Sequence, residues 1–391
     1  SRQRPSRILS MDIAMECTSE DDGDGDICGI IEADGLALED VPEAGSKGAD
    51  PEGASWRVSA LTLRAPRPAV VEDEDGDLVV ARCPELASTA GEDALASRLA
   101  GTRIELRRLA SSSLSRVGLQ LWAGALVLSD LLLARPGLVA GRRVCELGAG
   151  LGLCSLIAAR AGAASVLCSD GSSEAVANCE ANLRRNGGCQ QVRSAVVSWE
   201  DPPPAPAVGA ASGDSVGSLS EAGLRLSTSS AGAWLWGAEV LLAADVIYDA
   251  AAAEALVALV ARLLGHGRAE ALYLALEKRV YFSSATLQPE VAAYPQFVED
   301  CQRHNLTITP VDLTGVPVHF DYVRSRFYEL VMVTAGAGRG GLDPDAGVCC
   351  AESTSPEFER RVTDAQTDTE TGRQARAHPT VNRLDCVGQK K

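Results

Sequence analysis

The sequence has few of the features by which proteins bind metals or nucleic acids. Its 12 cysteines are scattered without a C-x-x-C pair or a Cys/His cluster, so neither a zinc site nor the disulfide framework of a secreted protein is indicated. Acidic residues outnumber Lys and Arg by 53 to 36, which gives a net charge of -17. Because neutralisation of phosphates needs a basic face, we expect no direct nucleic-acid partner. From the cysteine pattern we expect no metal site, and reduced thiols in a nuclear or cytoplasmic protein.

Long apolar runs are also missing. The two nearest candidates, Leu121 to Ala134 and Ala250 to Leu264, contain charged residues and are shorter than the roughly twenty residues that a membrane-spanning helix requires. Both are typical of amphipathic core helices, and we expect no membrane partner and a monomeric protein.

Composition divides the chain into parts. Residues 1–55 are acidic and glycine-rich and residues 336–391 are glycine-rich and polar, without periodic apolar positions, which predicts a disordered N-terminal segment and a disordered C-terminal tail. Residues 56–110 show strand-like alternation and predict a β-rich extension. Residues 111–335 form the main domain, with a flexible insertion at 201–237 that is rich in Pro, Ser and Gly.

Strand and helix patterns alternate within the main domain. The residues read as strands at 165–168, 192–197, 239–243 and 269–276, with helical patterns between them, followed by a helix from about Pro289 to His304 and strands at 306–311 and 327–334. Such alternation predicts an α/β fold with a Rossmann-like sheet and right-handed crossovers. Ligands bind at the carboxyl ends of such strands, which places these residues on one rim: Glu146, Asp170, Trp199, Asp245 and Glu277.

A glycine turn is the most informative motif. Val144–Gly152 reads V-C-E-L-G-A-G-L-G, with Gly148, Gly150 and Gly152 between an apolar strand and a helical segment. Glycine permits positive φ and close approach of a ligand to a helix N-terminus, and Asp170 stands about twenty residues later, where such folds place a ribose-binding carboxylate. We predict a nucleoside-bearing cofactor; the alternative is a turn that binds nothing.

The spacing and Glu146 distinguish between cofactors. Dinucleotide sites have G-x-G-x-x-G, whereas this chain has G-x-G-x-G with a carboxylate two residues before the first glycine. A carboxylate would repel a pyrophosphate and suits an ammonium and a sulfonium. The predicted cofactor is therefore S-adenosyl-L-methionine.

The region from about 100 to 335 resembles the seven-β-strand methyltransferases, and among them the family-16 group of protein lysine methyltransferases. The matching stretches are V-G-L-Q-L-W-A-G-A from Val117, C-E-L-G-A-G-L-G, Asp170, S-W at Ser198, A-A-D-V-I-Y-D, and L-E-K-R-V-Y-F from Leu276. The resemblance implies seven strands with the last antiparallel, S-adenosylmethionine as cofactor, and a protein substrate that carries the target lysine.

Site residues follow from the same motif matches. The resemblance places Gln120, Trp122 and Ala244 by the cofactor, Glu146 and the three glycines by its methionine part, Asp170 on the ribose and Trp199 against adenine. It places Asp245 and Tyr248 beside the target lysine. Asp245 would orient the substrate, with two alternatives: a general base or a helix N-cap. Relatives often carry an acid where this chain has Ser198, which could supply one weaker hydrogen bond.

The same fold also occurs with other functions. A nucleic-acid methyltransferase usually has an Asn/Asp-Pro-Pro-aromatic turn, and this chain reads A-D-V-I-Y from Ala244 to Tyr248 without prolines. A small-molecule methyltransferase, or an interaction protein that binds cofactor without catalysis, would keep the same fold. The expected function is a protein-lysine N-methyltransferase that acts on a non-histone protein.

Overall fold

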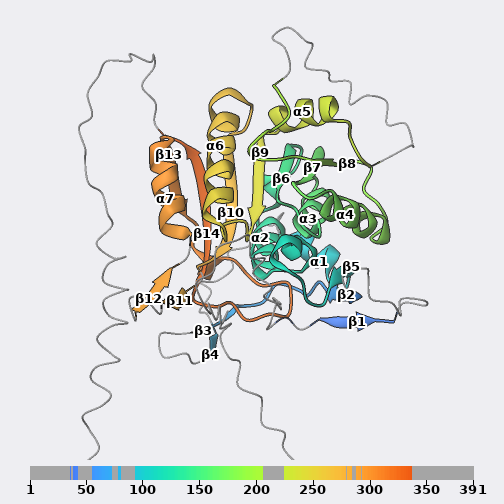
Figure 1. The fold of residues 1–391 in the computed structure, drawn as a ribbon. Coiled ribbons are helices and arrows are strands. Elements are labelled where there is room, and N and C mark those ends of the chain that lie inside the picture. Colours follow the sequence, from blue (N-terminus) through green and yellow to red (C-terminus); the bar gives the residue numbers. More distant parts are fainter. Residues whose placement is uncertain are drawn as a thin grey trace, which may run out of the picture. The chain divides into compact units, whose positions relative to one another are not determined.

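The central sheet has seven strands, in the order β13, β14, β10, β9, β6, β7, β8 (Figure 1). Strand β14 runs antiparallel to both of its neighbours, and the other pairs are parallel. This confirms the predicted Rossmann-like α/β fold with an antiparallel last strand. The strands are β6 (Arg143–Leu147), β7 (Ser165–Asp170), β8 (Val192–Val196), β9 (Val240–Ala244), β10 (Ala271–Glu277), β13 (Leu306–Pro310) and β14 (Tyr328–Ala335).

The computed structural model describes residues 36, 38–42, 55–72, 78–80, 93–205, 224–278, 280–283, 288–291 and 293–336. All of them lie within one compact unit, residues 1–338. Its helices are α1 (Asp93–Leu99), α2 (Ala123–Ala134), α3 (Leu153–Arg160), α4 (Ser173–Arg185), α5 (Thr228–Gly237), α6 (Ala250–His266) and α7 (Tyr294–Arg303).

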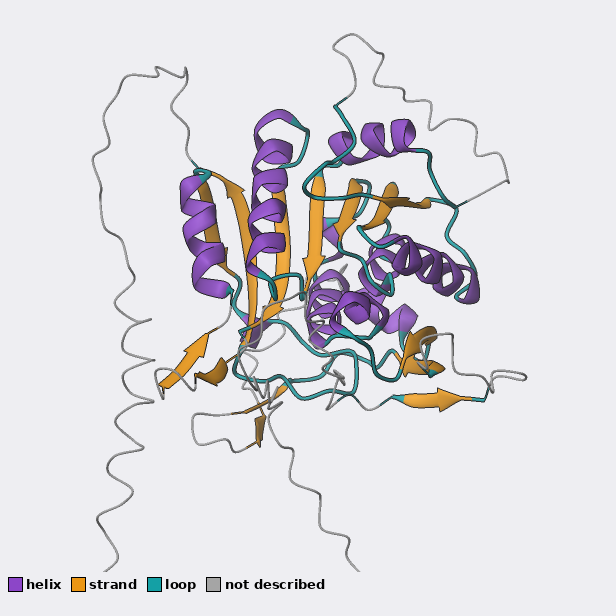
Figure 2. Ribbon diagram, in the orientation of Figure 1, coloured by secondary structure: helices purple, strands orange, loops and turns teal. Residues whose placement is uncertain are grey.

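Helices cover both faces of the sheet (Figure 2). Successive strand residues point to opposite faces. In β9, accordingly, Val240 and Leu242 join one buried cluster and Leu241 and Ala243 join the other. The first cluster includes residues of α2, α3 and α4, and the second includes residues of α5, α6 and α7. Near-continuous apolar strands, such as V-L-L-A-A in β9, are the consequence of this two-sided burial.

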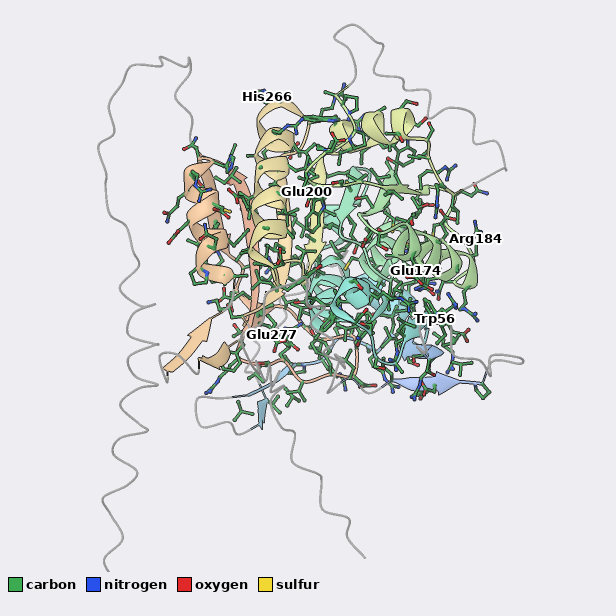
Figure 3. The ribbon with its side chains drawn as sticks, viewed as in Figure 1. Trp56, Glu174, Arg184, Glu200, His266 and Glu277 are labelled. Atoms are coloured by element: carbon green, nitrogen blue, oxygen red, sulfur yellow. The ribbon has the colours of Figure 1, made fainter. Side chains whose placement is uncertain are left out.

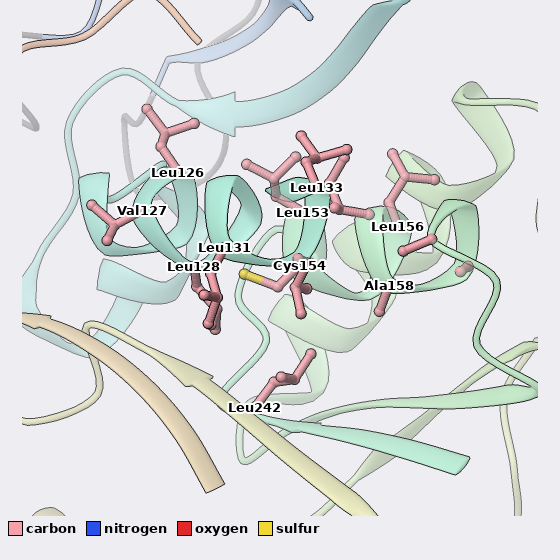
Figure 4. Packing of buried hydrophobic residues seen from close by; sticks show 14 of the residues in the cluster. Leu126, Val127, Leu128, Leu131, Leu133, Leu153, Cys154, Leu156, Ala158 and Leu242 are labelled. Atoms are coloured by element: carbon pink, nitrogen blue, oxygen red, sulfur yellow. The ribbon is translucent and has the colours of Figure 1, made fainter. Parts of the chain in front are cut away.

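Helix α2 lies within the first cluster, against α3 and β9 (Figure 4). The stretch Leu114–Ala134, which contains it, is long and apolar enough to cross a membrane by length and composition, but 72% of its most apolar window is buried inside the fold. Leu128, Leu131 and Leu132 are each 0% exposed. Burial of one such leucine contributes about 1.5–3 kcal/mol, so core packing accounts for the hydropathy of this helix.

A cluster of buried polar groups holds residues 319–324 against α2. Asp130, 0% exposed, accepts hydrogen bonds from the Tyr322 hydroxyl (2.7 Å), the Arg324 guanidinium (2.9 Å) and the backbone N–H of His319 (2.8 Å). A buried charge without its partner is strongly destabilising, so these contacts fix the segment that precedes β14 against α2.

Smaller sheets lie outside the central one. Strands β1 (Glu39–Val41), β2 (Trp56–Thr62) and β5 (Arg103–Leu109) form an antiparallel sheet, which confirms β structure in the predicted extension. Two hairpins complete the described strands: β3 (Val70–Glu72) with β4 (Leu78–Val80), and β11 (Val280–Ser283) with β12 (Gln288–Val291).

Several sequence expectations need correction. Strand β1 lies inside the segment predicted to be disordered, because its backbone pairs with β2. Helix α5 lies inside the predicted insertion, where Ala231 and Leu235 are buried against the sheet. The helix expected from about Pro289 begins at Tyr294, because residues 288–291 pair with β11. The remaining residues of the insertion and all but Gly336 of the predicted tail lie outside the described residues.

Candidate active site

A cleft of about 360 Å³ opens at the carboxyl ends of β6, β7 and β9. This volume lies within the usual range for ligand sites. The structure brings ten of the eleven predicted site residues together in its lining: Gln120, Trp122, Glu146, Gly148, Gly150, Asp170, Trp199, Ala244, Asp245 and Tyr248.

The glycine turn between β6 and α3 leaves no room for side chains. At Gly148, where φ is 69°, a Cβ would lie 2.7 Å from Val246 Cγ1 and 3.1 Å from the Trp199 ring. Gly152 lies outside the cleft lining. It is the N-cap residue of α3 at φ 80°, and a Cβ there would lie 2.3 Å from Cys179 Sγ. Glycine is therefore needed at Gly148 to shape the cleft and at Gly152 to pack α3 against α4.

Glu146 is a buried acid of β6, 2% exposed, and its side chain reaches the first turn of α3. Its carboxylate accepts hydrogen bonds from the backbone N–H of Ser155 (2.7 Å) and from the Ser155 hydroxyl. Burial raises the pKa of Glu146 to about 7, and in the described part of the chain no Lys or Arg forms an ion pair with it. A buried acid without a cationic partner, in the wall of a cleft, is suited to a positively charged ligand.

Asp170 ends β7 and faces the glycine turn. Its two oxygens accept hydrogen bonds from the backbone N–H groups of Gly150 (3.0 Å) and Ser172 (2.9 Å). Burial raises the pKa of Asp170, and these two hydrogen bonds oppose that effect. Each carboxylate oxygen has a second lone pair, so the fixed side chain can still accept from ligand hydroxyls.

Gln120 and Trp122 form another part of the lining. The Gln120 amide donates to the Ser112 hydroxyl (2.7 Å), and the Trp122 indole N–H donates to the carbonyl of Val117 (2.8 Å). Both N–H groups therefore donate to other groups of the protein, and these hydrogen bonds fix the two side chains in the lining of the cleft.

Trp199 follows β8 and packs against the second buried cluster. Its neighbour Ser198 donates a hydrogen bond of 2.5 Å to Glu200, and this bond is the main cause of the lowered pKa of Glu200. All three residues line the cleft. An acid thus lies in the lining two residues after Ser198, at a position that the sequence analysis did not single out.

Asp245 joins three segments that are distant in the sequence. Its carboxylate accepts hydrogen bonds from the backbone N–H of Gly124 in the first turn of α2 (2.6 Å) and of Glu277 at the end of β10 (3.0 Å). The residue has φ 54°, a left-handed conformation that Asp tolerates better than most residues. A Cβ at Gly124 would lie 2.5 Å from Asp245 Oδ2, so the close approach requires glycine.

These contacts show which helix the Asp245 carboxylate caps. The carboxylate supports the N-terminus of α2, not that of α6, whose N-cap is Asp249 with its side chain on the N–H of Ala252 (2.8 Å). Tyr248 lies between the two acids, is 36% exposed and lines the cleft. Asp245 and Tyr248 thus line the part of the cleft beside the glycine turn, where the Val246 side chain lies against Gly148.

Arg116 is a lining residue that the sequence analysis missed. It lies in the 3-10 helix η1 (Leu114–Leu119), and its guanidinium forms an ion pair with Glu174 of α4 (2.6 Å). No motif marks it, because the contact depends on packing of η1 against α4. In the part of the chain that the structure describes, no group of three or more His, Cys, Asp or Glu residues is arranged to hold a metal.

Comparisons with known proteins agree with this geometry. Residues 104–211 match the model of a family described as lysine methyltransferase. Methyltransferase-like protein 22 of Mus musculus is 29% identical over 330 residues, covering 74% of this chain and 76% of the mouse protein. The human protein of the same name is 33% identical over 171 residues, covering 37% of this chain and 42% of the human protein. Protein-lysine N-methyltransferase EFM3 of Chaetomium thermophilum is 28% identical over 214 residues, covering 54% of each chain.

Proposed function

We propose that this chain, whose residues 104–211 match the model of the lysine methyltransferase family, transfers a methyl group from S-adenosyl-L-methionine to a lysine side chain of another, non-histone protein. The observation that carries the proposal is the construction of the cleft. Glu146 and Asp170 line the cleft with the glycine turn between them, and Asp245 and the Tyr248 ring line the part of the cleft beside that turn.

The residues present fit the cofactor. The turn at Gly148 and Gly150 has no room for Cβ atoms against Val246 and the Gly118 carbonyl, and Glu146 offers a carboxylate to the cationic methionine part. Asp170 would accept hydrogen bonds from the ribose hydroxyls, and Trp199 would lie against adenine. Gln120, Trp122 and Ala244 also line the cleft. When bound, S-adenosylmethionine supplies an electrophilic methyl group.

Asp245 and Tyr248 would position the acceptor lysine. The amine must reach the cleft neutral, and its proton leaves to water. Asp245 already accepts two backbone hydrogen bonds, and protonation during turnover would weaken them. We therefore assign it the orientation of the amine, with the Tyr248 ring as a wall. Orientation and removal of water are large sources of acceleration for such a reaction.

The decisive experiment is transfer of labelled methyl groups. The purified chain, supplied with radiolabelled S-adenosylmethionine, is added to an extract of cells that lack this protein, and the labelled residue is identified. We expect label on a protein lysine. Label on RNA or on a small molecule would contradict the proposal, and a rise in melting temperature with S-adenosylhomocysteine but no transfer would show a cofactor-binding protein without catalysis.

The setting of the protein is also part of the proposal. We place it in the nucleus or cytoplasm, as a monomer that binds neither membranes nor nucleic acid directly. The net charge of -17 and the free thiols of six described cysteines support this placement. Light scattering of the purified chain and fractionation of cells test it.

A further inference from the structure

The strand pair β2-β5 has two outer edges that are covered in different ways. At β5, side-chain amides of α4 take the place of a strand. Asn182 accepts from the backbone N–H of Arg107 (2.7 Å), and Asn186 accepts from that of Glu105 (3.0 Å) and donates to its carbonyl (2.7 Å). At β2, the edge is covered by β1, which has three residues. The β5 edge is thus covered by helix α4 of the domain, whereas the β2 edge is covered only by the three residues of β1.

Two arginines face each other across β2 and β5. Arg57 and Arg108 are direct cross-strand partners, and like charges in such positions are destabilising. Asp40 of β1 lies between them, with carboxylate oxygens 3.0 Å from Arg57 and 3.8 Å from Arg108. It also accepts from the Ser59 hydroxyl (2.9 Å). Burial and the neighbouring Arg57 lower the pKa of Arg108, and Asp40 opposes them. The edge therefore requires an anion.

The segment that supplies this anion is held by a pattern of apolar and acidic residues. Leu36 and Leu38 pack against the first buried cluster, and Glu39 forms an ion pair with Arg103 (3.1 Å). Both acids of β1 are exposed, and exposed ion pairs contribute little to stability. A three-residue strand held by so few contacts can be displaced by a longer extended segment that carries apolar and acidic side chains at the same positions.

The β2 edge is connected to the candidate active site. Trp56, the first residue of β2, carries the Arg107 guanidinium 3.5 Å from its ring centre, and Arg116 lies 6.0 Å from the same ring. Arg116 lines the cleft and pairs with Glu174, which lies near Trp56 (Figure 3). Because β1 runs antiparallel to β2, the C-terminal end of a segment on this edge leads toward Trp56.

We propose that the outer edge of β2 docks an extended acidic segment of the protein substrate, and that Leu36 and residues 38–41 of this chain cover the edge until that segment replaces them. The substrate segment adds a strand to β2, places an acid between Arg57 and Arg108, and packs apolar side chains where Leu36 and Leu38 lie. This inference rests on the proposed function only in calling the partner a substrate.

A fluorescent peptide tests the edge directly. The probe has the sequence of residues 36–44, LALEDVPEA, and its binding to the full chain is measured by fluorescence anisotropy. In the double variant Glu39→Lys/Asp40→Lys, the chain's own segment is repelled by the arginines. We expect this variant to bind the probe at least tenfold more tightly than the unchanged chain.

Matched variants show where the probe binds. Adding Arg57→Gln and Arg108→Gln to the double variant should abolish binding. Adding Arg64→Gln should leave it unchanged, because Arg64, which is about as exposed as Arg57, pairs with Asp321 outside this edge. A control probe with lysines in place of the two acids, LALKKVPEA, should not bind.

Three results would overturn the proposal. They are equal affinity of the unchanged chain and the double variant, equal binding of both probes, and absence of probe binding to a double variant that still binds S-adenosylhomocysteine. Probe binding is measured without methyl transfer, so a chain that docks the probe but transfers no methyl group would contradict the proposed function alone.

Discussion

The two walls of the cleft are built in different ways. The cofactor wall comes largely from the continuous unit β6, α3 and β7, in which Glu146, the glycine turn and Asp170 follow one another. At the acceptor wall, Asp245 depends on Gly124 and Glu277, which lie more than a hundred residues before it and 32 residues after it. A local unit places its residues by strand and turn geometry, whereas the acceptor wall forms only when the sheet and α2 are in place.

The acids of the two walls also differ in how their charge is stabilised. Glu146 is buried, has a pKa raised to about 7, and forms hydrogen bonds to Ser155. Asp245 has two backbone N–H partners that belong to separate elements. Glu146 is therefore an acid that a cationic ligand would stabilise, and Asp245 is an acid whose position the fold already fixes.

The largest expected effect is at the acceptor wall. Asp245→Ala should lower turnover about a hundredfold or more through lost orientation of the amine, while affinity for S-adenosylmethionine stays within about threefold. Stability should fall by about 1–3 kcal/mol, because two N–H groups lose their acceptor. Asp249→Ala is the matched control: it removes the N-cap of α6 at a cost of about 1 kcal/mol and should leave turnover unchanged. Equal losses of affinity and turnover in Asp245→Ala would assign this acid to the cofactor wall.

On the cofactor wall, Asp170→Asn should weaken binding of S-adenosylmethionine by about 1.5–3 kcal/mol, because Asn replaces a charged acceptor poorly. The fold should remain intact. Calorimetric titration measures the affinity, and an unchanged value would remove Asp170 from the site.

Glu146→Gln tests the cost of the buried charge. The raised pKa of Glu146 means that the folded state keeps its proton where the unfolded state has lost it. The contribution of Glu146 to stability is therefore fully present when the pH is below 4.5, the ordinary pKa of a Glu carboxyl. It is lost as the pH rises through about 7, the pKa in the folded state. The variant should match the unchanged chain at low pH and exceed it by about 3 kcal/mol at pH 8, yet bind the cofactor about tenfold more weakly there. Melting curves and titrations across this range are the measurements. A stability difference that does not vary with pH would refute the assignment.

A smaller effect is expected at Tyr248. If the ring serves as a wall, Tyr248→Phe should keep turnover within about threefold, since it retains the apolar surface, whereas Tyr248→Ala should lose much more. Steady-state kinetics on the labelled protein substrate distinguish the two. A large loss in Tyr248→Phe would show that the hydroxyl takes part.

The smallest effect is expected from the ends of the chain. Deletion of residues 1–55 and 337–391 removes β1 but none of the cleft lining, so cofactor affinity should not change. Loss of about 1 kcal/mol from the short strand would lower the melting temperature by about 2–4 °C. An insoluble or unfolded product would show that one of these ends supplies part of the core.

The sequence by itself determined the sheet and the cofactor wall. Apolar runs such as V-L-L-A-A predict buried parallel strands, and the glycine turn with Glu146 and Asp170 predicts a site, because each depends on neighbours along the chain. Only the tertiary structure decided that Gly152 packs α3 against α4 instead of lining the cleft, and that Asp245 supports α2. These contacts join surfaces of separate elements, and their positions follow from packing rather than from local sequence.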